Sequence, residues 1–325
     1  MSSPVPLVRV VRSGLEESVH LGDVVVCDAA GRSVAVAGDP GRTVYARSSM
    51  KPLQAAVSLS RIGDDVPADQ VAIMCASHNG EPDHVAAVRR LLRGGGVPVT
   101  ALRCPEDVPA RRRDVAAAPG ARRIFHNCSG KHAGMLRACA ASGWDLETYR
   151  VRSHPLQRAV ATAVGRTTGM ARPHVGVDGC GVPVFGLPLR AMATLFARLA
   201  DPSSLGRLEP HARTAVSAMR AHPFLVAGTG RADTAIMQHA PNVIAKVGAE
   251  ALFCAAVLDR GLGVAVKIAD GGDRASGPAL VAALRAIDAI DDGQRRRIDP
   301  VARRPILGGG APVGEMLVDV PLARA

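Results

Sequence analysis

Residues 243–270 read VIAKVGAEALFCAAVLDRGLGVAVKIAD, and this stretch decides the fold class. It holds three apolar runs, and the last two are joined by a tight turn at 259–263. Short apolar runs that end at turn residues are typical of buried β-strands. We therefore predict three neighbouring strands in the C-terminal part of the chain.

The N-terminal part of the chain predicts further strands. Residues 5–12 (VPLVRVVR) and 22–37 (GDVVVCDAAGRSVAVA) have strand composition, and AAGR in the second makes a hairpin turn. The run 71–75 (VAIMC) also predicts a strand, and the Pro-, Ala- and Arg-rich residues 101–123 predict an exposed connection. Helical patterns lie at about 52–60, 84–93, 131–142, 154–169, 187–200, 208–221, 233–240 and 276–290.

Strands thus come from both ends of the sequence, and helices lie between them. We predict an α/β (α+β) fold in which an antiparallel sheet of N- and C-terminal strands is flanked by helices, with a mostly helical subdomain inserted. The 325 residues are expected to form one domain, 1–325. Its sheet part is expected at about 1–75 and 241–325, and its helical part at about 76–240.

The composition argues against several classes of protein. The net charge is +11, but only eight residues are aromatic, too few for a surface that stacks nucleic-acid bases. No apolar run is long enough for a membrane span, and MSSPVPLVRV lacks the pattern of a signal peptide, so we expect a cytoplasmic protein. The seven widely spaced cysteines include no CxxC pair, which argues against a disulfide framework and a zinc ribbon.

Lysine is rare in this sequence: 40 residues are Lys or Arg, and only four of them are Lys. Arginine stays charged at any usable pH, so a site that needs an amine able to lose its proton must keep lysine. The four are Lys51, Lys131, Lys246 and Lys267. They are therefore enriched in candidates for chemistry, and chance survival on the surface is the alternative.

Residues 48–51 read SSMK, an SxxK tetrad directly before helical sequence. Ser48 and Lys51, three positions apart, share a face of a first helical turn, where a neutral buried lysine can take the serine proton. Ser49 is a second candidate nucleophile with a less suitable spacing. Pro52 lacks the N–H that would bond to the Ser48 carbonyl, so the first turn is expected to begin later or to be distorted.

Two further stretches place polar side chains beside glycine. CASHNGE (75–81) offers Ser77 and His78, although taken alone this stretch is better explained as a capped loop before a helix. HNCSGKHAGM (126–135) opens a helix whose first backbone N–H groups point at an anion or a carbonyl oxygen.

A third stretch, DGCGVP (178–183), is a glycine-rich turn that lets the backbone approach a ligand closely. Cys128 and Cys180 are soft metal ligands if they meet in space, with Lys131 or His132 nearby. The alternative is two small buried thiols, which the sequence alone slightly favours.

The other two lysines lie in the apolar C-terminal runs. Lys246 opens KVGAE and is similar to the Lys-Thr/Ser-Gly edge strand of penicillin-recognising serine enzymes, with Val247 in place of the hydroxyl residue. Lys267 precedes ADGG, where pairing with Asp270 or Glu250 would make it a structural lysine.

Taken together, in order and spacing, SSMKP, ASHNGE, HNCSGKHAGM, DGCGVP, KVGAE and KIADGG resemble the Rhizobium-type, thermolabile L-asparaginases of the asparaginase II family. The resemblance extends from about residue 5 to 290, and HNCSGKHAGM and DGCG are its most specific parts. It implies hydrolysis of L-asparagine, a small-molecule substrate, to L-aspartate and ammonia. It also implies a homodimer and a fold related to serine β-lactamases and glutaminases.

The resemblance implies a serine–lysine mechanism with a covalent acyl-enzyme. Ser48 resembles the nucleophile and Lys51 its base. Ser77 resembles a second active serine, and Lys246 a second active lysine, a role for which Lys267 competes. From the residues alone, either lysine can accept the proton of Ser48 or Ser77, and water then hydrolyses the acyl-enzyme.

The resemblance also implies a zinc site beside the substrate pocket, formed by Cys128, Lys131 and Cys180. Two cysteines and a lysine are an unusual ligand set for hydrolysis, so zinc is expected as an accessory ion that orients groups. Asp178 is placed to bind the ammonium group of the substrate. The expected substrate-binding residues are Arg47, His78, Asn127, Lys131 and Asp178.

Two functions of other classes are alternatives to L-asparaginase activity. A β-lactamase or penicillin-binding-like serine acylase needs an SDN-like triplet and KTG, and the sequence has neither. The second alternative is a non-enzymatic zinc-binding protein, and enzyme activity that survives zinc removal would count against it. Glutaminase activity is a close neighbour, because asparagine and glutamine differ by one methylene, which a pocket distinguishes by about 1–3 kcal/mol.

Overall fold

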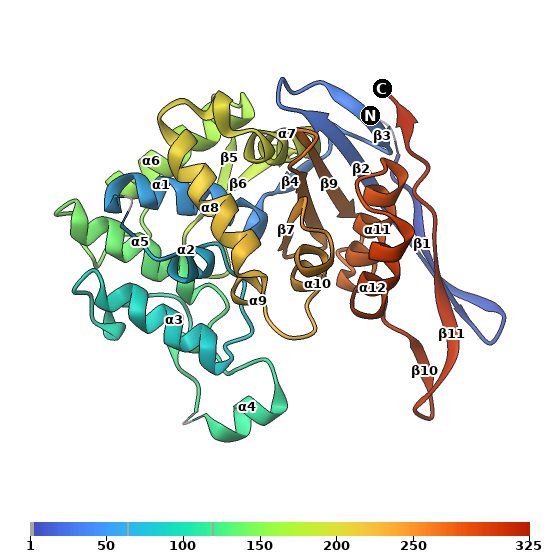
Figure 1. Ribbon diagram of the computed structural model, residues 1–325, viewed down its shortest axis with the longest axis horizontal. Coiled ribbons are helices and arrows are strands. Elements are labelled where there is room, and N and C mark those ends of the chain that lie inside the picture. The colour runs from blue at the N-terminus through green and yellow to red at the C-terminus, as the bar shows by residue number, and fades with distance from the viewer. Residues whose placement is uncertain (1–2, 64, 119) are drawn as a thin grey trace. The chain divides into compact units, whose positions relative to one another are not determined.

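The chain folds into two compact units in this computed structural model, which describes residues 3–63, 65–118 and 120–325 (Figure 1). The sheet unit comprises Met1–Ser49, Gly186–Asp201 and Gly230–Ala325. The helical unit comprises Met50–Phe185 and Pro202–Thr229. That the whole chain forms one domain stays a prediction.

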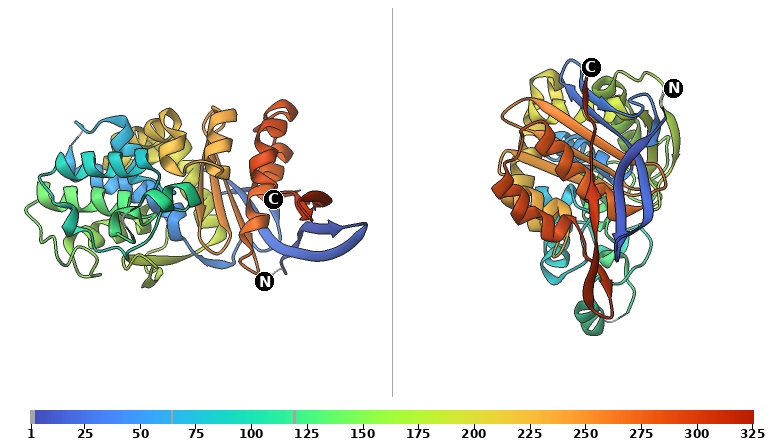
Figure 2. Two further views of the ribbon diagram at one scale, coloured as in Figure 1. Left: turned by 90° about the horizontal axis from the view of Figure 1, so that it is seen from below. Right: turned by 90° about the vertical axis from the view of Figure 1, so that its right-hand side faces the viewer.

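An antiparallel sheet forms the centre of the sheet unit, with the strand order β10-β11-β1-β2-β9-β8-β7. Strands from the two ends of the chain meet where β2 pairs with β9, with Val25 opposite Ala265. Figure 2 shows the β10–β11 hairpin running beside β1 and β2. The strands are β1 (Val5–Arg12), β2 (Leu15–Asp28), β3 (Ser33–Ala37), β7 (Val243–Gly248), β8 (Leu252–Val257), β9 (Leu262–Ile268), β10 (Ile306–Gly308), β11 (Ala311–Val318) and β12 (Ala323–Arg324). The predicted fold class, with three C-terminal strands β7–β9, is confirmed.

Every residue of β8 is buried, which indicates that both faces of the central strands are covered. Both α7 (Leu189–Ala200) and α11 (Asp273–Ala286) pack against β8 and β9. A Cβ added at Gly263 would lie only 2.0 Å from the backbone oxygen of Ala193, so glycine is what lets α7 approach β9. The unit also contains β4 (Thr43–Tyr45), which pairs with residues 186–188, α10 (Ala232–His239) and α12 (Asp292–Ala302).

In the helical unit, α1 packs against α5, α6 and α8, and its residues from Lys51 to Leu59 are buried. A Cβ added at Gly130 would lie 2.1 Å from the backbone oxygen of Ile73, so glycine also permits the contact of α5 with α2. The elements are α1 (Lys51–Ile62), α2 (Ala68–Met74), α3 (Pro82–Arg93), α4 (Arg112–Ala117), α5 (Ser129–Ala141), α6 (Pro155–Thr168), β5 (His174–Val177), the start of β6 (Pro183–Pro188), α8 (Glu209–Ala221) and α9 (Pro223–Val226).

The strand predicted at 71–75 is wrong, because this run forms the end of α2. Val71, Ala72, Ile73 and Met74 are all buried, so the run shows no polar face that would distinguish a helix from a strand. The connection predicted at 101–123 contains the short helix α4, which has no buried residue. Across the described residues, no helix has the length and apolar character needed to cross a bilayer.

Candidate active site

The SSMK tetrad begins in a 3-10 turn, η1 (Arg47–Met50), and the α-helix begins only at Lys51, with Pro52 in its first turn. The predicted late start of the helix is therefore confirmed. Arg47 has a φ of 44°, in the left-handed region that is costly for a residue with a Cβ. Strained backbone of this kind clusters at functional sites, and here it directly precedes Ser48.

The two serines of the tetrad have different surroundings. Ser49 is fully buried, and its Oγ donates a hydrogen bond of 2.9 Å to the carbonyl oxygen of Lys246. Ser48 is only partly buried. Because the hydroxyl proton of Ser49 is held by the backbone of β7, Ser48 is the better candidate for attack on a substrate.

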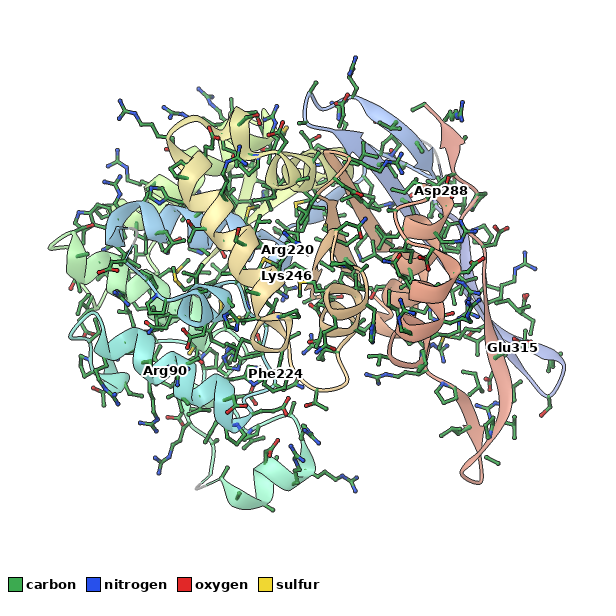
Figure 3. All side chains as sticks on the ribbon, viewed as in Figure 1. Arg90, Arg220, Phe224, Lys246, Asp288 and Glu315 are labelled. Atoms are coloured by element: carbon green, nitrogen blue, oxygen red, sulfur yellow. The ribbon has the colours of Figure 1, made fainter. Side chains whose placement is uncertain are left out.

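Lys246 and Asp233 form a buried ion pair in the sheet unit. The Nζ of Lys246 lies 3.5 Å from Oδ2 of Asp233, and both side chains are at most 1% exposed (Lys246 is labelled in Figure 3). The same Oδ2 accepts a hydrogen bond of 3.1 Å from the backbone N–H of Val247. Burial opposes the charge of Asp233, but the positive charges of Lys246 and Arg231 hold its pKa below the ordinary value.

Sequence reasoning missed Asp233. A usable signal was present, because the acid stands in the apolar run ADTAIM (232–237), and a carboxylate in a buried helix face requires a partner. Its partner, Lys246, lies 13 residues further along the chain and meets it only through the tertiary fold.

Lys267 lies in a different environment. It is partly exposed on β9, and its Nζ donates hydrogen bonds to the carbonyl oxygens of Glu250 and Ile268. Lys246, in contrast, is bonded through its carbonyl to Ser49, the neighbour of Ser48. Which of the two is the second active lysine stays a prediction.

Lys51 and Ser77 form the closest serine–lysine contact in the helical unit. Lys51 is fully buried, and its Nζ lies 2.9 Å from Oγ of Ser77 and 2.5 Å from the carbonyl oxygen of Ala76. Burial lowers the pKa of Lys51, and the nearby positive charge of Lys131 lowers it further. A lysine that loses its proton readily, at hydrogen-bond distance from a hydroxyl, has the geometry of a base and its partner.

His78 has both ring nitrogens engaged within the protein. Its Nδ1 accepts a hydrogen bond of 3.1 Å from the backbone N–H of Gly80, so Nε2 carries the proton and donates to Oγ of Ser129 at 3.0 Å. Burial holds the pKa of His78 well below its usual value, which keeps the ring neutral. His78 therefore fixes the loop that carries Ser77, and its predicted contact with substrate stays a prediction.

The structure brings Cys128, Lys131 and Cys180 together. The Nζ of Lys131 donates a hydrogen bond of 2.9 Å to Sγ of Cys180. A hydrogen bond from Cys180 and the positive charges of Lys51 and Lys131 lower the pKa of Cys128 well below the usual range of a thiol. The direction of this shift favours the thiolate form of Cys128 beside the ammonium group of Lys131.

Asp178 and Asn127 border these sulfurs. Oδ2 of Asp178 lies 4.0 Å from Nζ of Lys131 and 3.7 Å from Sγ of Cys180. Oδ1 of Asn127 lies 3.0 Å from Sγ of Cys128. A carboxylate and an amide oxygen therefore lie beside the sulfurs, where a cationic group of a ligand would find acceptors.

The donor set of this cluster fits zinc in its chemistry. Two sulfurs, one of them favoured as thiolate, and an amine nitrogen are ligand types that zinc accepts, provided that Lys131 gives up a proton. Among the described residues, no group of three or more His, Cys, Asp or Glu side chains is arranged to hold a metal ion. A metal at this cluster therefore needs Lys131 or a non-protein ligand to complete its shell.

Glu81 closes the ASHNGE loop by accepting four hydrogen bonds. The donors are the backbone N–H and the hydroxyl of Thr229, both at 2.8 Å, Arg111 at 2.9 Å and Asn79 at 3.1 Å. Burial raises the pKa of this carboxyl, but the hydrogen bonds outweigh it and lower the pKa to about 2.

Because of Glu81, the free energy of unfolding is expected to vary with pH in the acidic range. The carboxyl has an ordinary pKa of 4.5 and a folded pKa of about 2, so its stabilisation is complete above pH 4.5 and is lost as the pH falls towards 2. The contribution is about 3 kcal/mol at neutral pH. Urea unfolding of Glu81→Gln should show a loss at pH 3 that is about half as large as the loss at pH 7 or less. An equal loss in the exposed control Glu106→Gln would contradict this account.

The predicted site residues fall into two groups, one in each unit. The sheet unit holds Arg47, Ser48 and Lys246, and the helical unit holds Lys51, Ser77, His78, Asn127, Cys128, Lys131, Asp178 and Cys180. Within the helical unit, contacts connect the lysines, the two cysteines and Asp178. The assigned roles of these residues stay predictions.

Comparison with known proteins identifies one family. The model of the L-asparaginase II family matches residues 8–318. A search of curated proteins finds no match. A solved structure described as a beta-lactamase from Mycobacterium bovis is similar over 89% of this chain and 97% of that chain, with 20% sequence identity and a TM-score of 0.41. The fold class rests on the strand order described above and not on this similarity.

Proposed function

The chain belongs to the L-asparaginase II family, and from this premise we propose that it hydrolyses L-asparagine to L-aspartate and ammonia by a serine–lysine mechanism. Membership of this family makes the chain an amide hydrolase. The observation that supports Lys51 as the base is the contact of 2.9 Å between its buried Nζ and Oγ of Ser77.

In the proposed reaction, Ser48 attacks the side-chain amide carbon and Lys51 accepts the proton. Three observations support this division of roles: Ser48 is the accessible serine of its tetrad, Lys51 follows it by three residues, and burial favours the neutral amine of Lys51. In this division of roles Ser77 does not attack the substrate. Its hydrogen bond with Lys51 holds the amine of that lysine in place. The proton then passes to the amide nitrogen, ammonia leaves, and water hydrolyses the acyl-enzyme.

Substrate recognition needs one group for each charge of the amino acid. Asp178 carries a carboxylate that is suited to the α-ammonium group, and Arg47 carries a guanidinium that is suited to the α-carboxylate. Comparing kcat/KM for asparagine and glutamine tests the substrate. We expect asparagine to be preferred, and a preference for glutamine would reassign the substrate without affecting the serine–lysine chemistry.

Trapping the acyl-enzyme tests the mechanism. Acid quenching during turnover, followed by peptide mass spectrometry, should place an aspartyl adduct on the peptide that contains Ser48, and Ser48→Ala should lack it. An adduct on Ser77 would exchange the roles of the two serines. Full activity in Ser48→Ala and in Ser77→Ala would reject the mechanism.

We also propose that Cys128, Lys131 and Cys180 hold a zinc ion, which would orient neighbouring groups. The juxtaposed sulfurs and the amine of Lys131 support this ligand set. In that arrangement Lys131 is a ligand, so Asp178 faces the substrate ammonium group without a competing lysine charge.

Measuring the zinc content of the purified protein tests the proposed zinc site without relying on enzyme activity. The purified protein should contain about one zinc per chain, and Cys180→Ser should lose it. Cys254→Ser, which changes a buried thiol of β8, should keep it. Because the ion is accessory, chelation should reduce asparagine hydrolysis without abolishing it. A metal-free protein with full activity would contradict the zinc site.

A homodimer is the assembly that we propose, on the basis of the family resemblance. Light scattering coupled to size-exclusion chromatography should give a mass of about twice 33.6 kDa. A mass of one chain at micromolar concentration would reject it.

A further inference from the structure

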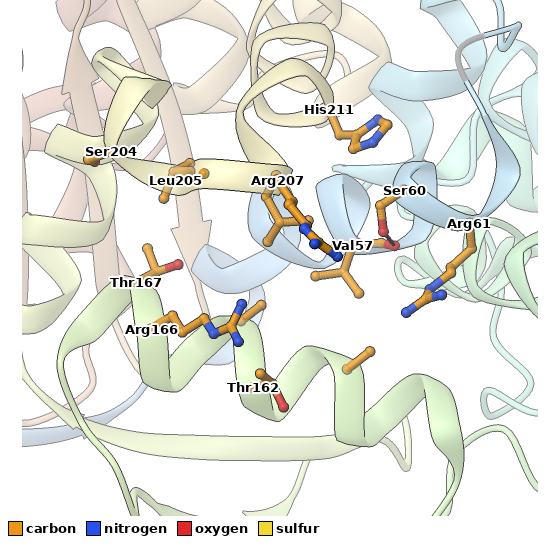
Figure 4. A pocket seen from close by; sticks show the side chains of 14 residues that line it. Val57, Ser60, Arg61, Thr162, Arg166, Thr167, Ser204, Leu205, Arg207 and His211 are labelled. Carbon is orange, nitrogen blue, oxygen red and sulfur yellow. Dashed lines mark hydrogen bonds between the residues drawn. The ribbon is translucent and has the colours of Figure 1, made fainter.

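The helical unit contains a pocket of about 620 Å³ (Figure 4). Four segments line it: the second half of α1, the second half of α6, the η4 segment (Pro202–Leu208) and the start of α8. This volume is within the range of pockets that hold a small organic molecule. None of its lining residues is among the predicted active-site residues, so a ligand here would occupy a separate site.

Positive charge dominates the lining of this pocket. Arg61, Arg166 and Arg207 come from α1, α6 and η4, respectively, and of the described residues that line the pocket none is Asp or Glu. Figure 4 shows the three guanidinium groups directed toward the middle of the pocket. Three guanidinium groups around one hollow make the electrostatic potential there more positive, which attracts an anion.

The fold sets the positions of these arginines. The Cζ of Arg61 lies 5.2 Å from the ring centre of Trp144, a cation–π contact that restrains the side chain. At Gly206 the η4 segment leaves helical geometry, with φ 56° and ψ −124°, and this turn directly precedes Arg207. Glu209, two residues after Arg207, is engaged by Arg213 at 2.9 Å.

The other residues that line the pocket restrict which kind of anion would fit. Ser60 and Thr162 donate their hydroxyl protons to backbone carbonyls of their own helices, at 2.8 and 2.9 Å, so these two hydroxyl protons are already engaged within the protein. Val57, Ala163 and Leu205 add an apolar wall. A ligand that fits both parts carries several negative charges on one side and an apolar group on the other.

We propose that this pocket binds a small polyphosphate. Guanidinium groups bind phosphate oxygens through paired N–H donors, and a diphosphate group has a charge that matches three arginines. The apolar wall would contact the base or sugar of a nucleoside diphosphate, whereas inorganic pyrophosphate would leave it unused. This proposal does not depend on the serine–lysine mechanism.

Calorimetric titration of the full chain at low ionic strength tests the proposal, with ADP and inorganic pyrophosphate as separate probes. At least one probe should bind saturably with one site per chain. Arg207→Ala and Arg61→Ala should each weaken binding about tenfold, the loss expected for one charged hydrogen-bonding group. Tighter binding of ADP would assign the pocket to a nucleotide, and tighter binding of pyrophosphate to the inorganic ion.

The matched control is Arg158→Ala, because Arg158 is an exposed arginine of α6 that does not line the pocket. It should bind the probes as the wild type does. Absence of saturable binding with both probes, or equal losses in Arg158→Ala and Arg207→Ala, would overturn the proposal. Since Arg207 is exposed, its replacement should leave the melting temperature unchanged, and a loss of binding can then be assigned to the pocket.

Discussion

Lys51→Arg is expected to lower kcat for asparagine hydrolysis by about 10²–10⁴-fold, the range that a general base contributes. Arginine keeps a positive charge at position 51 but stays protonated at any usable pH, so it cannot accept the serine proton. Lys51 is suited to this role because burial lowers its pKa and favours the neutral amine. Ammonia release in steady state measures the effect.

Lys267→Arg is the matched control, because Lys267 is partly exposed and donates only to backbone carbonyls, a role that arginine can fill. We expect its kcat to be close to that of the wild type. In the wild type, the acidic limb of the pH–rate profile should follow the loss of the proton from Lys51, and Lys51→Arg should lack this limb. If both variants kept full activity, Lys51 would not be the base.

Asp233→Ala is expected to lower the free energy of unfolding by about 3–5 kcal/mol, because it leaves the ammonium group of Lys246 buried without its partner. Both side chains are almost fully excluded from water, so solvent cannot replace the lost carboxylate. Chemical denaturation at pH 7 measures the loss. The exposed acid Glu315 provides a control, and Glu315→Ala should change stability by less than about 0.5 kcal/mol.

A double variant separates two possible causes of the expected loss of stability: the unpaired charge of Lys246 and the cavity left at position 233. Asp233→Ala combined with Lys246→Met removes both charges and should regain most of the stability that Asp233→Ala loses. If the double variant were as unstable as Asp233→Ala alone, the loss would come from the cavity at position 233 and not from the charge of Lys246.

The sheet could be predicted from the sequence because its strands carry a strong local signal. In 243–270 the apolar runs and the turn at 259–263 correspond to β7, β8 and β9. The strand predicted at 71–75 is wrong because residues 71–74, the buried end of α2, show no polar face and match a buried strand in composition. A short apolar run is therefore compatible with a buried strand, as in β8, or with the buried end of a helix, as in α2.

Sequence motifs identified most of the candidate site residues, but they did not identify the contacts between residues that lie in different motifs. The scarcity of lysine drew attention to Lys51, Lys131 and Lys246, all three of which are buried and engaged with polar partners. The pairing of Lys51 with Ser77, 26 positions away, and of Lys246 with Asp233 depends on helix packing that no local pattern encodes.

The central claim is that this chain hydrolyses asparagine by serine–lysine chemistry. The most direct measurement is the release of ammonia and aspartate from L-asparagine by the purified wild type and by Ser48→Ala. The account predicts equal amounts of the two products from the wild type and almost none from Ser48→Ala. No ammonia from the wild type, or full activity in Ser48→Ala, would contradict it.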